Sequence, residues 1–379
     1  MEFVDLKAQY RRYKSEIDAR MRRVLDHGQF IMGPEIRELE EVLADFVGVG
    51  HCVTVASGTD SLEIALRALG IGAGDEVVTT PFTWISTAEA VCLVGAEPVF
   101  VDIDPVTYNI DAERIEAAIT SRTKALLPVS LFGQMPDCDR IGEIAEYYGL
   151  PVIEDAAQSF GASQRGAKSC GRTTIGSTSF FPAKPLGCYG DGGALFTNDD
   201  ALADTMRALR SHGGLRRHEH PLLGMNGRLD TLQAAVLLAK WPHFQWELDQ
   251  RAQIAARYSK SLRGVCSVPE TASENTHVYA QYTVRHAHRD EISKELAATH
   301  IPTAVYYPKC LHEQPVFARY GYARGDFPNA ERAAQEVLSL PMHPFLTTAE
   351  QDRIVEALIQ TSLRRARAGS ESCVASQAV

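Results

Sequence analysis

Three short segments of the chain carry side chains whose chemistry suits a shared small-molecule site. The first, Ala56-Ser57-Gly58-Thr59-Asp60, ends an apolar run and precedes an amphipathic stretch. Free backbone N–H groups at a helix start, together with serine or threonine hydroxyls, can bind a phosphate. Ordinary capping of the helix by Ser57 or Thr59 accounts for the same residues, so this segment alone leaves both interpretations open.

The second and third segments contribute a carboxylate and an amine. Asp155 ends the apolar run 151–155, where a buried carboxylate requires a partner. Lys184 follows the run 177–181, in a loop whose glycines permit close approach of a ligand. Taken singly, Asp155 could form a buried ion pair with an arginine, and a lysine in a loop is most often a solvated surface charge.

Together, the three features match the requirements of pyridoxal 5'-phosphate (PLP). The phosphate of PLP needs a helix start or an equivalent set of donors, its ring nitrogen needs a carboxylate, and its aldehyde needs a lysine that forms a Schiff base. The chain offers one candidate for each, and all three lie at or just after the end of an apolar run. The sequence therefore predicts PLP as the cofactor.

The elements that must position these residues follow from an alternation of short β-branched runs with amphipathic stretches. Helical patterns lie between the first five runs, which predicts a mostly parallel sheet with helices on both faces. Ligands bind beyond the carboxyl ends of such strands, where all three segments lie. Two helices are predicted before the sheet, at about 8–27 and 35–47, and the runs are 51–56, 76–80, 98–102, 124–129, 151–155, 177–181 and 193–197.

The second half of the chain changes pattern and predicts a smaller domain. From residue 199 to about 262 the pattern is helical, and beyond it strands at 279–285 and near 302–307 alternate with helices at 289–299, about 328–337 and 347–363. We therefore expect an α/β domain over 1–243 and an α+β domain over 244–364. The small polar residues of 365–379 predict a disordered tail.

Composition excludes several classes of protein. The 379 residues include 38 Lys and Arg against 48 Asp and Glu, a net charge of −10, which argues against binding to nucleic acid or to anionic membranes. The eight cysteines form no C-x-x-C pair, and no cluster predicts a metal site, which favours reduced thiols in the cytoplasm. Apolar stretches are interrupted well short of the roughly 20 residues that a bilayer requires.

Several ordered motifs resemble the sugar aminotransferases of the DegT/DnrJ/EryC1/StrS family over about residues 3–362. They are SGTDSLEIALRALGIGAGDEVV, PVFVDIDPVTYNID, PVIEDAAQSFGA, TSFFPAKPLGCYGDGGALFT and GRLDTLQAAVLLAKW. GQFIMGPE, FFPAKPLGCYGDGG and SLPMHP narrow the resemblance to UDP-2-acetamido-2-deoxy-hexuluronate 3-aminotransferases of lipopolysaccharide and O-antigen synthesis. This resemblance implies the PLP-dependent transferase fold of type I, as in aspartate aminotransferase.

The resemblance also implies roles for individual residues. Lys184 would form the Schiff base, and Asp155 would pair with the ring nitrogen. Gln158 would contact the ring hydroxyl, and Trp84 would stack on the ring face. The phosphate would be held by Gly58, Thr59 and Ser179. Because Asn226 would reach the phosphate from the partner subunit, the expected unit is a homodimer with active sites at the subunit interface.

Residues that contact the substrate are less firmly predicted. Arg228 is the candidate for binding a substrate carboxylate through two parallel hydrogen bonds, and a surface salt bridge is an equal alternative. Tyr306, Tyr307 and His312 are candidates for nucleotide contacts, with solvated surface positions as the alternative. The chain departs from the family at Gly227, where Asn-Ser-Arg is common, and at Cys310, where proline is usual.

The resemblance implies a transamination in two halves. L-glutamate would convert PLP to pyridoxamine phosphate (PMP) and leave as 2-oxoglutarate, and the amine would then pass to C3 of a UDP-linked 3-keto-2-acetamido-2-deoxy-hexuronic acid. One alternative is amination at C4 of a 4-keto-6-deoxy sugar nucleotide. A sugar dehydratase of this family would carry histidine in place of Lys184, and a non-catalytic regulatory protein would not need that lysine.

Overall fold

A central sheet of seven strands organises the first half of the chain in the computed structural model, which describes residues 1–216 and 218–376. Two hydrogen-bonded groups, β3-β2-β4 and β5-β8-β9-β1, are joined by parallel bridges from Leu126 to Val152 and from Val129 to Asp155. Their order is therefore β3-β2-β4-β5-β8-β9-β1. The strands are β1 His51–Val55, β2 Glu76–Thr79, β3 Glu97–Phe100, β4 Thr123–Leu126, β5 Ile153–Asp155, β8 Ile175–Ser179 and β9 Gly193–Thr197.

One strand of this sheet departs from the parallel arrangement. β9 pairs antiparallel with both β8 and β1, whereas β2, β3, β4, β5 and β8 run parallel. The reason is the connection: β9 follows β8 through a loop without a crossover helix, and adjacent strands joined in that way run in opposite directions. That loop, 180–192, contains Lys184.

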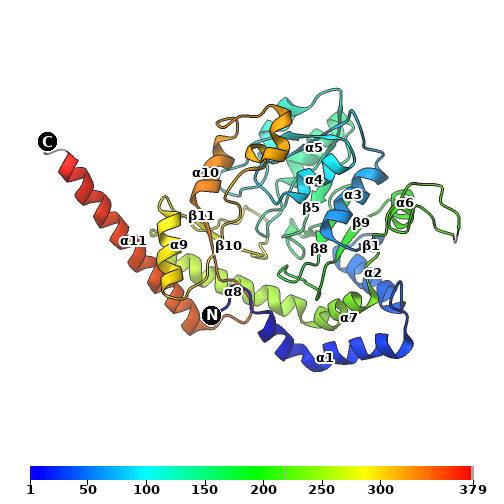
Figure 1. Ribbon diagram of the computed structural model, residues 1–379, viewed down its shortest axis with the longest axis horizontal. Coiled ribbons are helices and arrows are strands. Elements are labelled where there is room, and N and C mark those ends of the chain that lie inside the picture. Colours follow the sequence, from blue (N-terminus) through cyan, green and yellow to red (C-terminus); the bar gives the residue numbers. More distant parts are fainter. Residues whose placement is uncertain (217, 377–379) are drawn as a thin grey trace.

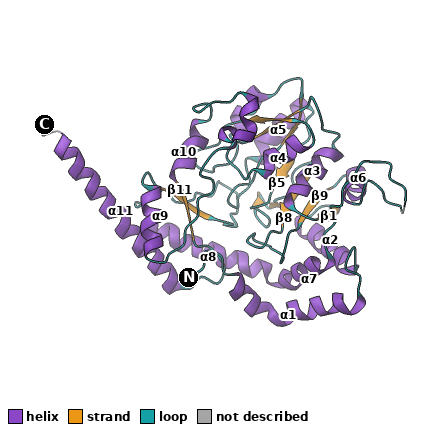
Figure 2. Cartoon of the chain, in the orientation of Figure 1, coloured by secondary structure: helices purple, strands orange, loops and turns teal. Residues whose placement is uncertain are grey.

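Helices cover the sheet and extend beneath it (Figures 1 and 2). A run of helices α1, α7 and α8 lies along one side of the molecule, while α3 and α4 lie beside the strands. The predicted helix between β3 and β4 is wrong: η1 and η2 replace it, because Ile115 is fully buried against Ile110 and Ile141 and the chain bends there. The helices of this half are α1 Leu6–His27, α2 Pro34–Val47, α3 Gly58–Ala68, α4 Ser86–Leu93, η1 Ala112–Arg114, η2 Glu116–Ala118, α5 Cys138–Tyr148, α6 Asp200–Arg210 and α7 Thr231–Lys240.

Local sequence explains where several of these helices begin and end. Asp5 caps α1 by accepting a hydrogen bond from the backbone N–H of Ala8, and Gly28 ends the helix in the left-handed conformation. Pro34 occupies the first turn of α2, where its missing N–H costs nothing. A small hairpin, β6 Ser163–Gln164 with β7 Ala167–Lys168, follows β5.

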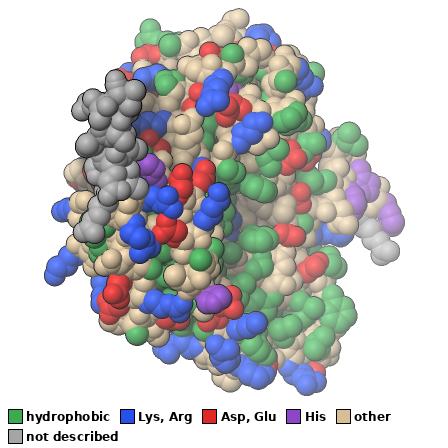
Figure 3. Space-filling model, turned by 60° about the vertical axis from the view of Figure 1, so that its left-hand side comes forward, with side chains coloured by type: hydrophobic (Ala, Val, Ile, Leu, Met, Phe, Trp, Pro, Cys, Tyr) green, Lys and Arg blue, Asp and Glu red, His purple; other side chains and the backbone are tan. Residues whose placement is uncertain are grey.

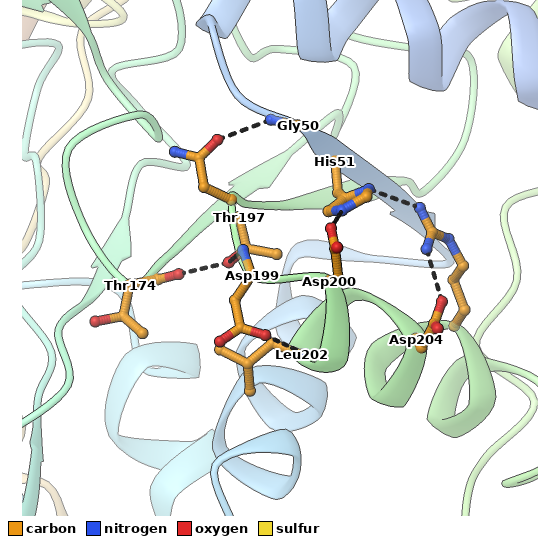
Figure 4. A network of polar contacts seen from close by, with 10 residues as sticks. Gly50, His51, Thr174, Thr197, Asp199, Asp200, Leu202 and Asp204 are labelled. Atoms are coloured by element: carbon orange, nitrogen blue, oxygen red, sulfur yellow. Dashed lines mark hydrogen bonds and ion pairs between the residues drawn. The ribbon is translucent and has the colours of Figure 1, made fainter.

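The start of α6 is tied to the sheet by polar contacts (Figure 4). Asp199 caps α6 by accepting from the N–H of Leu202 at 2.9 Å, and its own N–H donates to the Thr197 hydroxyl at the end of β9. His51, at the start of β1, lies 2.7 Å from Asp200 and also contacts Arg207. These contacts fix α6 against the two antiparallel strands.

The second half of the chain has a core of its own. Tyr258, Tyr282, Leu296 and Leu338 belong to one buried cluster that joins α8, β10, α9, β11 and α11. The predicted strand near 302–307 is reduced to a single bridge from Ala304 to Ser339. The elements are η3 Trp241–His243, α8 Phe244–Leu262, β10 Tyr282–Arg285, α9 Arg289–Ala298, η4 Leu311–Glu313, η5 Pro315–Tyr320, α10 Pro328–Glu336, β11 Val337–Leu340 and α11 Thr348–Ser376.

The C-terminal helix α11 projects away from the body of the molecule (Figure 1). It continues through Ser376, and residues 377–379 lie outside the described part of the chain. The division at 243/244 and the disorder of 365–379 therefore stay predictions. Within the residues that the structure describes, no helix is both long and apolar enough to span a membrane.

Candidate active site

Asp155 is the last residue of β5 and is held by two donors. The Thr87 hydroxyl donates to its Oδ2 at 2.8 Å, and the backbone N–H of Ala157 donates to its Oδ1 at 3.2 Å. Only 6% of Asp155 is exposed, and this burial raises its carboxyl pKa while the two hydrogen bonds and the charge of Lys184 oppose the rise. The carboxylate keeps lone pairs available for a ligand donor.

Lys184 lies in the loop between β8 and β9, where its backbone N–H donates to the carbonyl of Phe181. The side chain is half-buried, and burial lowers the pKa of its amine, because the charged form loses solvent. The carboxylate of Asp155 acts in the opposite direction, so the two predicted catalytic groups influence each other across the site. A lysine with a lowered pKa supplies free amine for nucleophilic and proton-transfer chemistry.

The candidate phosphate cradle lies where α3 begins beside the end of β8. Ser57 caps α3 by accepting from the N–H of Asp60 at 3.0 Å, so the Ser57 hydroxyl has the capping role that the sequence left open. The first N–H groups of a helix have no acceptor within it, which leaves those of Gly58 and Thr59 for an anion. A Cβ on Gly58 would lie 2.7 Å from the Cβ of Ser179, so only glycine allows this close approach.

Replacing Gly58 with alanine is expected to weaken PLP binding by about tenfold, because the start of α3 or the end of β8 must move apart by a small distance. The measurement is the dissociation constant of PLP from fluorescence titration of the cofactor-free protein. Gly142→Ala is the matched control, since Gly142 lies within α5 and a Cβ there meets no atom within 4 Å. Equal PLP affinity in both variants would contradict the cradle.

One wall of the site is built from aromatic and amide groups. Gln158 accepts from the backbone N–H of Phe132 at 2.7 Å and donates to the Tyr307 hydroxyl at 3.0 Å. The ring centroid of Trp84 lies 6.0 Å from that of Tyr307, and 58% of Trp84 is exposed. Burial raises the pKa of the Tyr307 hydroxyl, with the nearby charge of Asp155 adding to the rise. The structure thus brings Gln158, Trp84 and Tyr307 together.

The remaining candidates for substrate contact lie in different surroundings. Tyr306 is half-buried and packs beside Phe3, with ring centroids 6.3 Å apart. His312 is 3% exposed, and its Nε2 lies 3.2 Å from Glu331. Cys310, the departure from the family pattern, is fully buried in the aromatic core, where its side chain packs instead of facing a ligand.

Asn226 and Arg228 lie on a surface strip and contact each other. The Arg228 guanidinium donates to Asn226 Oδ1 from Nε at 3.1 Å and from Nη2 at 2.6 Å. Gly227 between them is buried, and a Cβ there would meet the flexible Met225 side chain at 3.3 Å. The serine of the common family pattern would therefore require only a small adjustment of Met225.

Sequence reasoning missed three polar residues that support the site. Thr87 holds Asp155, and Ser86 contacts the Thr59 hydroxyl at 2.8 Å. Glu154 is fully buried on the opposite face of β5, where the hydroxyls of two serines and one backbone N–H donate to it. Thr83 and Thr87 are four residues apart and follow β2, and their hydroxyls contact each other. This spacing could have predicted a helix start with polar side chains at the edge of the sheet.

These residues fit PLP. The cradle at Gly58 excludes a side chain but leaves backbone donors for a phosphate, and the buried Asp155 carboxylate retains acceptor capacity for a protonated ring nitrogen. Lys184 supplies an amine near that carboxylate. Among the residues that the structure describes, there is no cluster of three or more histidine, cysteine or acidic side chains able to hold a metal ion.

Comparisons with known proteins agree with this geometry. The DegT/DnrJ/EryC1/StrS aminotransferase family profile matches residues 11–359. A Pseudomonas aeruginosa relative named UDP-2-acetamido-2-deoxy-3-oxo-D-glucuronate aminotransferase is 54% identical, with 94% of this chain and 99% of the relative covered.

Two solved structures extend the comparison. Streptomyces venezuelae DesV, in complex with a ketimine intermediate, has a TM-score of 0.94 at 40% identity, covering 95% of this chain and 98% of that one. NtdA from Bacillus subtilis, with bound cofactor PMP, has a TM-score of 0.86 at 33% identity, covering 92% and 82%. The fold, the site and these matches together place the chain in the DegT/DnrJ/EryC1/StrS family of PLP-dependent sugar aminotransferases.

Proposed function

We propose that this enzyme transfers an amino group from L-glutamate to C3 of a UDP-linked 3-keto-2-acetamido-2-deoxy-hexuronic acid, for surface polysaccharides such as lipopolysaccharide O-antigen. The observation that carries the proposal is the 54% identity, over nearly the whole of both chains, to a relative named for this 3-oxo-glucuronate. The site supports it, because Lys184 and Asp155 are close enough for their charges to influence each other and could supply the base and the carboxylate of a transamination.

Each residue has a defined task in this reaction. Bound PLP supplies an electron-accepting ring that stabilises negative charge on the carbon attached to the transferred nitrogen. The Lys184 amine removes the proton from that carbon and returns it to the other carbon bonded to the transferred nitrogen, which belongs to the cofactor. Asp155 keeps the ring nitrogen protonated, and Thr87 holds the carboxylate in place through its 2.8 Å hydrogen bond. Trp84 would stack on the ring face of bound PLP, and Gln158 would contact the ring hydroxyl.

Arg228 is proposed to bind a carboxylate in both halves of the reaction. Glutamate and the uronic acid each present one, and a guanidinium binds carboxylates through paired hydrogen bonds. Tyr306, Tyr307 and His312 remain candidates for contacts to the nucleotide.

The active unit is proposed to be a homodimer in the cytoplasm. Large apolar side chains are exposed near the site and on the segment before Asn226: Trp84 at 58%, Phe181 at 51% and Leu223 at 86%. Figure 3 shows apolar side chains gathered on one half of the face it draws. A partner subunit would cover such surface, and sedimentation velocity should give twice the mass of one chain.

The seven cysteines whose side chains are described are all free, which supports a reducing compartment.

The test of the proposed function is the visible absorption of the PLP-loaded protein through both half-reactions. L-glutamate should remove the cofactor's long-wavelength band, and the UDP-3-keto-uronate should restore it. A 4-keto-6-deoxy sugar nucleotide, which lacks the carboxylate, is the control acceptor and should leave the band absent. If only the 4-keto-6-deoxy sugar nucleotide restored the absorption band, the proposed C3 acceptor would be wrong and the C4 alternative would take its place.

A further inference from the structure

The side chains of Asn226 and Arg228 share one face of an extended strip. In an extended segment, residues two apart point to the same side, while the residue between them points to the other. Gly227 is accordingly buried against the body of the protein, and its neighbours are directed outward. Arg228 reaches Asn226 Oδ1 with two donors, Nε at 3.1 Å and Nη2 at 2.6 Å.

The backbone of this strip is held on both sides. The N–H of Ala56 donates to the Gly227 carbonyl at 2.8 Å, and the Gly227 N–H donates to the carbonyl of Arg210 at 3.0 Å. Arg210 is itself 4% exposed, and its guanidinium donates to the Thr54 carbonyl at 2.8 Å and to Glu40. The side chains of Asn226 and Arg228 therefore start from a fixed base, and only their own torsions remain to be set.

The chemistry of the contact sets the orientation of the Asn226 amide. A guanidinium has five N–H donors and no acceptor, so it can contact only the oxygen of a side-chain amide. With Oδ1 turned toward Arg228, the two N–H groups of Nδ2 are left facing other partners. A phosphate accepts hydrogen bonds and does not donate them when fully ionised, so this is the amide orientation that it needs.

We infer that Arg228 is a positioning residue that orients the Asn226 amide so that Nδ2 donates to the cofactor phosphate bound in the partner subunit. The inference rests on the homodimer of the proposed function, with Asn226 in the role that the family resemblance implies, reaching the phosphate of the partner subunit. The contact uses Nε and one N–H of Nη2, which leaves the second N–H of Nη2 and the two N–H groups of Nη1 for a substrate carboxylate. Arg228 can thus hold Asn226 and bind the substrate at once.

The experiment is a double-mutant cycle on cofactor affinity, measured without glutamate or sugar. Dissociation constants for PLP, and for pyridoxal as a probe without phosphate, are determined by fluorescence titration of the cofactor-free protein. Asn226→Ala and Arg228→Ala are each expected to weaken PLP binding by about tenfold, the usual size for a hydrogen bond to a charged group. Pyridoxal affinity should stay unchanged in both variants, and the double variant should be no weaker than Asn226→Ala alone.

Arg228→Lys is the conservative variant and should restore part of the PLP affinity, because an ammonium can donate one hydrogen bond to Oδ1. Wild-type PLP affinity in Arg228→Ala, beside a clear loss in Asn226→Ala, would overturn the positioning role. Additive losses in the double variant, or equal losses for pyridoxal, would overturn it as well. An unchanged PLP affinity in Asn226→Ala would remove the phosphate contact itself, whereas the two-step absorption test of transamination would be unaffected by that result.

Discussion

Lys184→Ala is expected to abolish measurable transamination, with kcat lowered by at least about 10⁴-fold, the upper range for loss of a general acid–base group. The substitution removes both the amine that bonds the cofactor and the base that moves the proton at the reacting carbon. The measurement is the initial rate with glutamate and the UDP-3-keto-uronate, together with the visible spectrum after addition of PLP. The variant should still bind PLP, because the cradle at Gly58 and the carboxylate of Asp155 are intact.

Exogenous methylamine separates lost chemistry from lost folding in this variant. A small amine can enter the space left by the side chain, so it should restore part of the rate in proportion to its free-base concentration. Because burial lowers the pKa of Lys184, the wild-type rate should persist to lower pH than the rescued rate of a solvated amine. Lys294→Ala, on the exposed face of α9, is the matched control and should retain full activity. Turnover in Lys184→Ala at the wild-type rate would favour a non-catalytic role for this lysine.

Asp155→Asn is expected to lower kcat by about 10²- to 10³-fold, the range found when one preorganised electrostatic group is removed from an active site. A neutral amide cannot hold the proton on the ring nitrogen, so the ring becomes a weaker acceptor of electrons. Burial raises the pKa of Asp155 in the folded protein, which disfavours its charged form. Any stability that the protonated carboxyl gives the folded protein is lost as the pH rises through that raised pKa. At neutral pH, Asp155 therefore contributes no such stability, and the cofactor-free Asp155→Asn variant should not unfold more easily than the wild type. Steady-state rates check the loss of kcat, and thermal unfolding checks the unchanged stability.

Glu154→Gln is the matched control for Asp155→Asn, because Glu154 is the adjacent buried carboxylate on the other face of β5. The Glu154 carboxylate accepts hydrogen bonds from the hydroxyls of Ser130 and Ser169 and from the Cys170 N–H. In Glu154→Gln, the NH2 group of the amide would face at least one of these donors. The expected result is a loss of about 1–3 kcal/mol in the free energy of unfolding with kcat nearly unchanged. If Glu154→Gln lost as much kcat as Asp155→Asn, the assignment of Asp155 alone to the ring nitrogen would be wrong.

The sequence predicted the fold because the fold depends on local patterns, and the same patterns point to Asp155 and Lys184 as the proposed catalytic pair. The seven apolar runs correspond to β1, β2, β3, β4, β5, β8 and β9, because runs of apolar and β-branched residues mark the buried strands. Asp155 ends one of these runs and Lys184 lies three residues after another, and a sheet brings the ends of its parallel strands to one edge. The direction of β9 was not predicted, because it depends on which strands become neighbours.

Contacts between distant segments were decided by the tertiary structure. Thr87 and Asp155 are 68 positions apart, and Gln158 and Tyr307 are 149 apart, so no spacing in the chain connects them. His312 illustrates the same limit, since its neighbour Glu331 and its burial follow from the packing of α10. Residue types and their order therefore determined the cofactor chemistry of this protein. The orientation and surroundings of each side chain were decided by packing, because the free energies of burial and hydrogen bonding depend on neighbours in space.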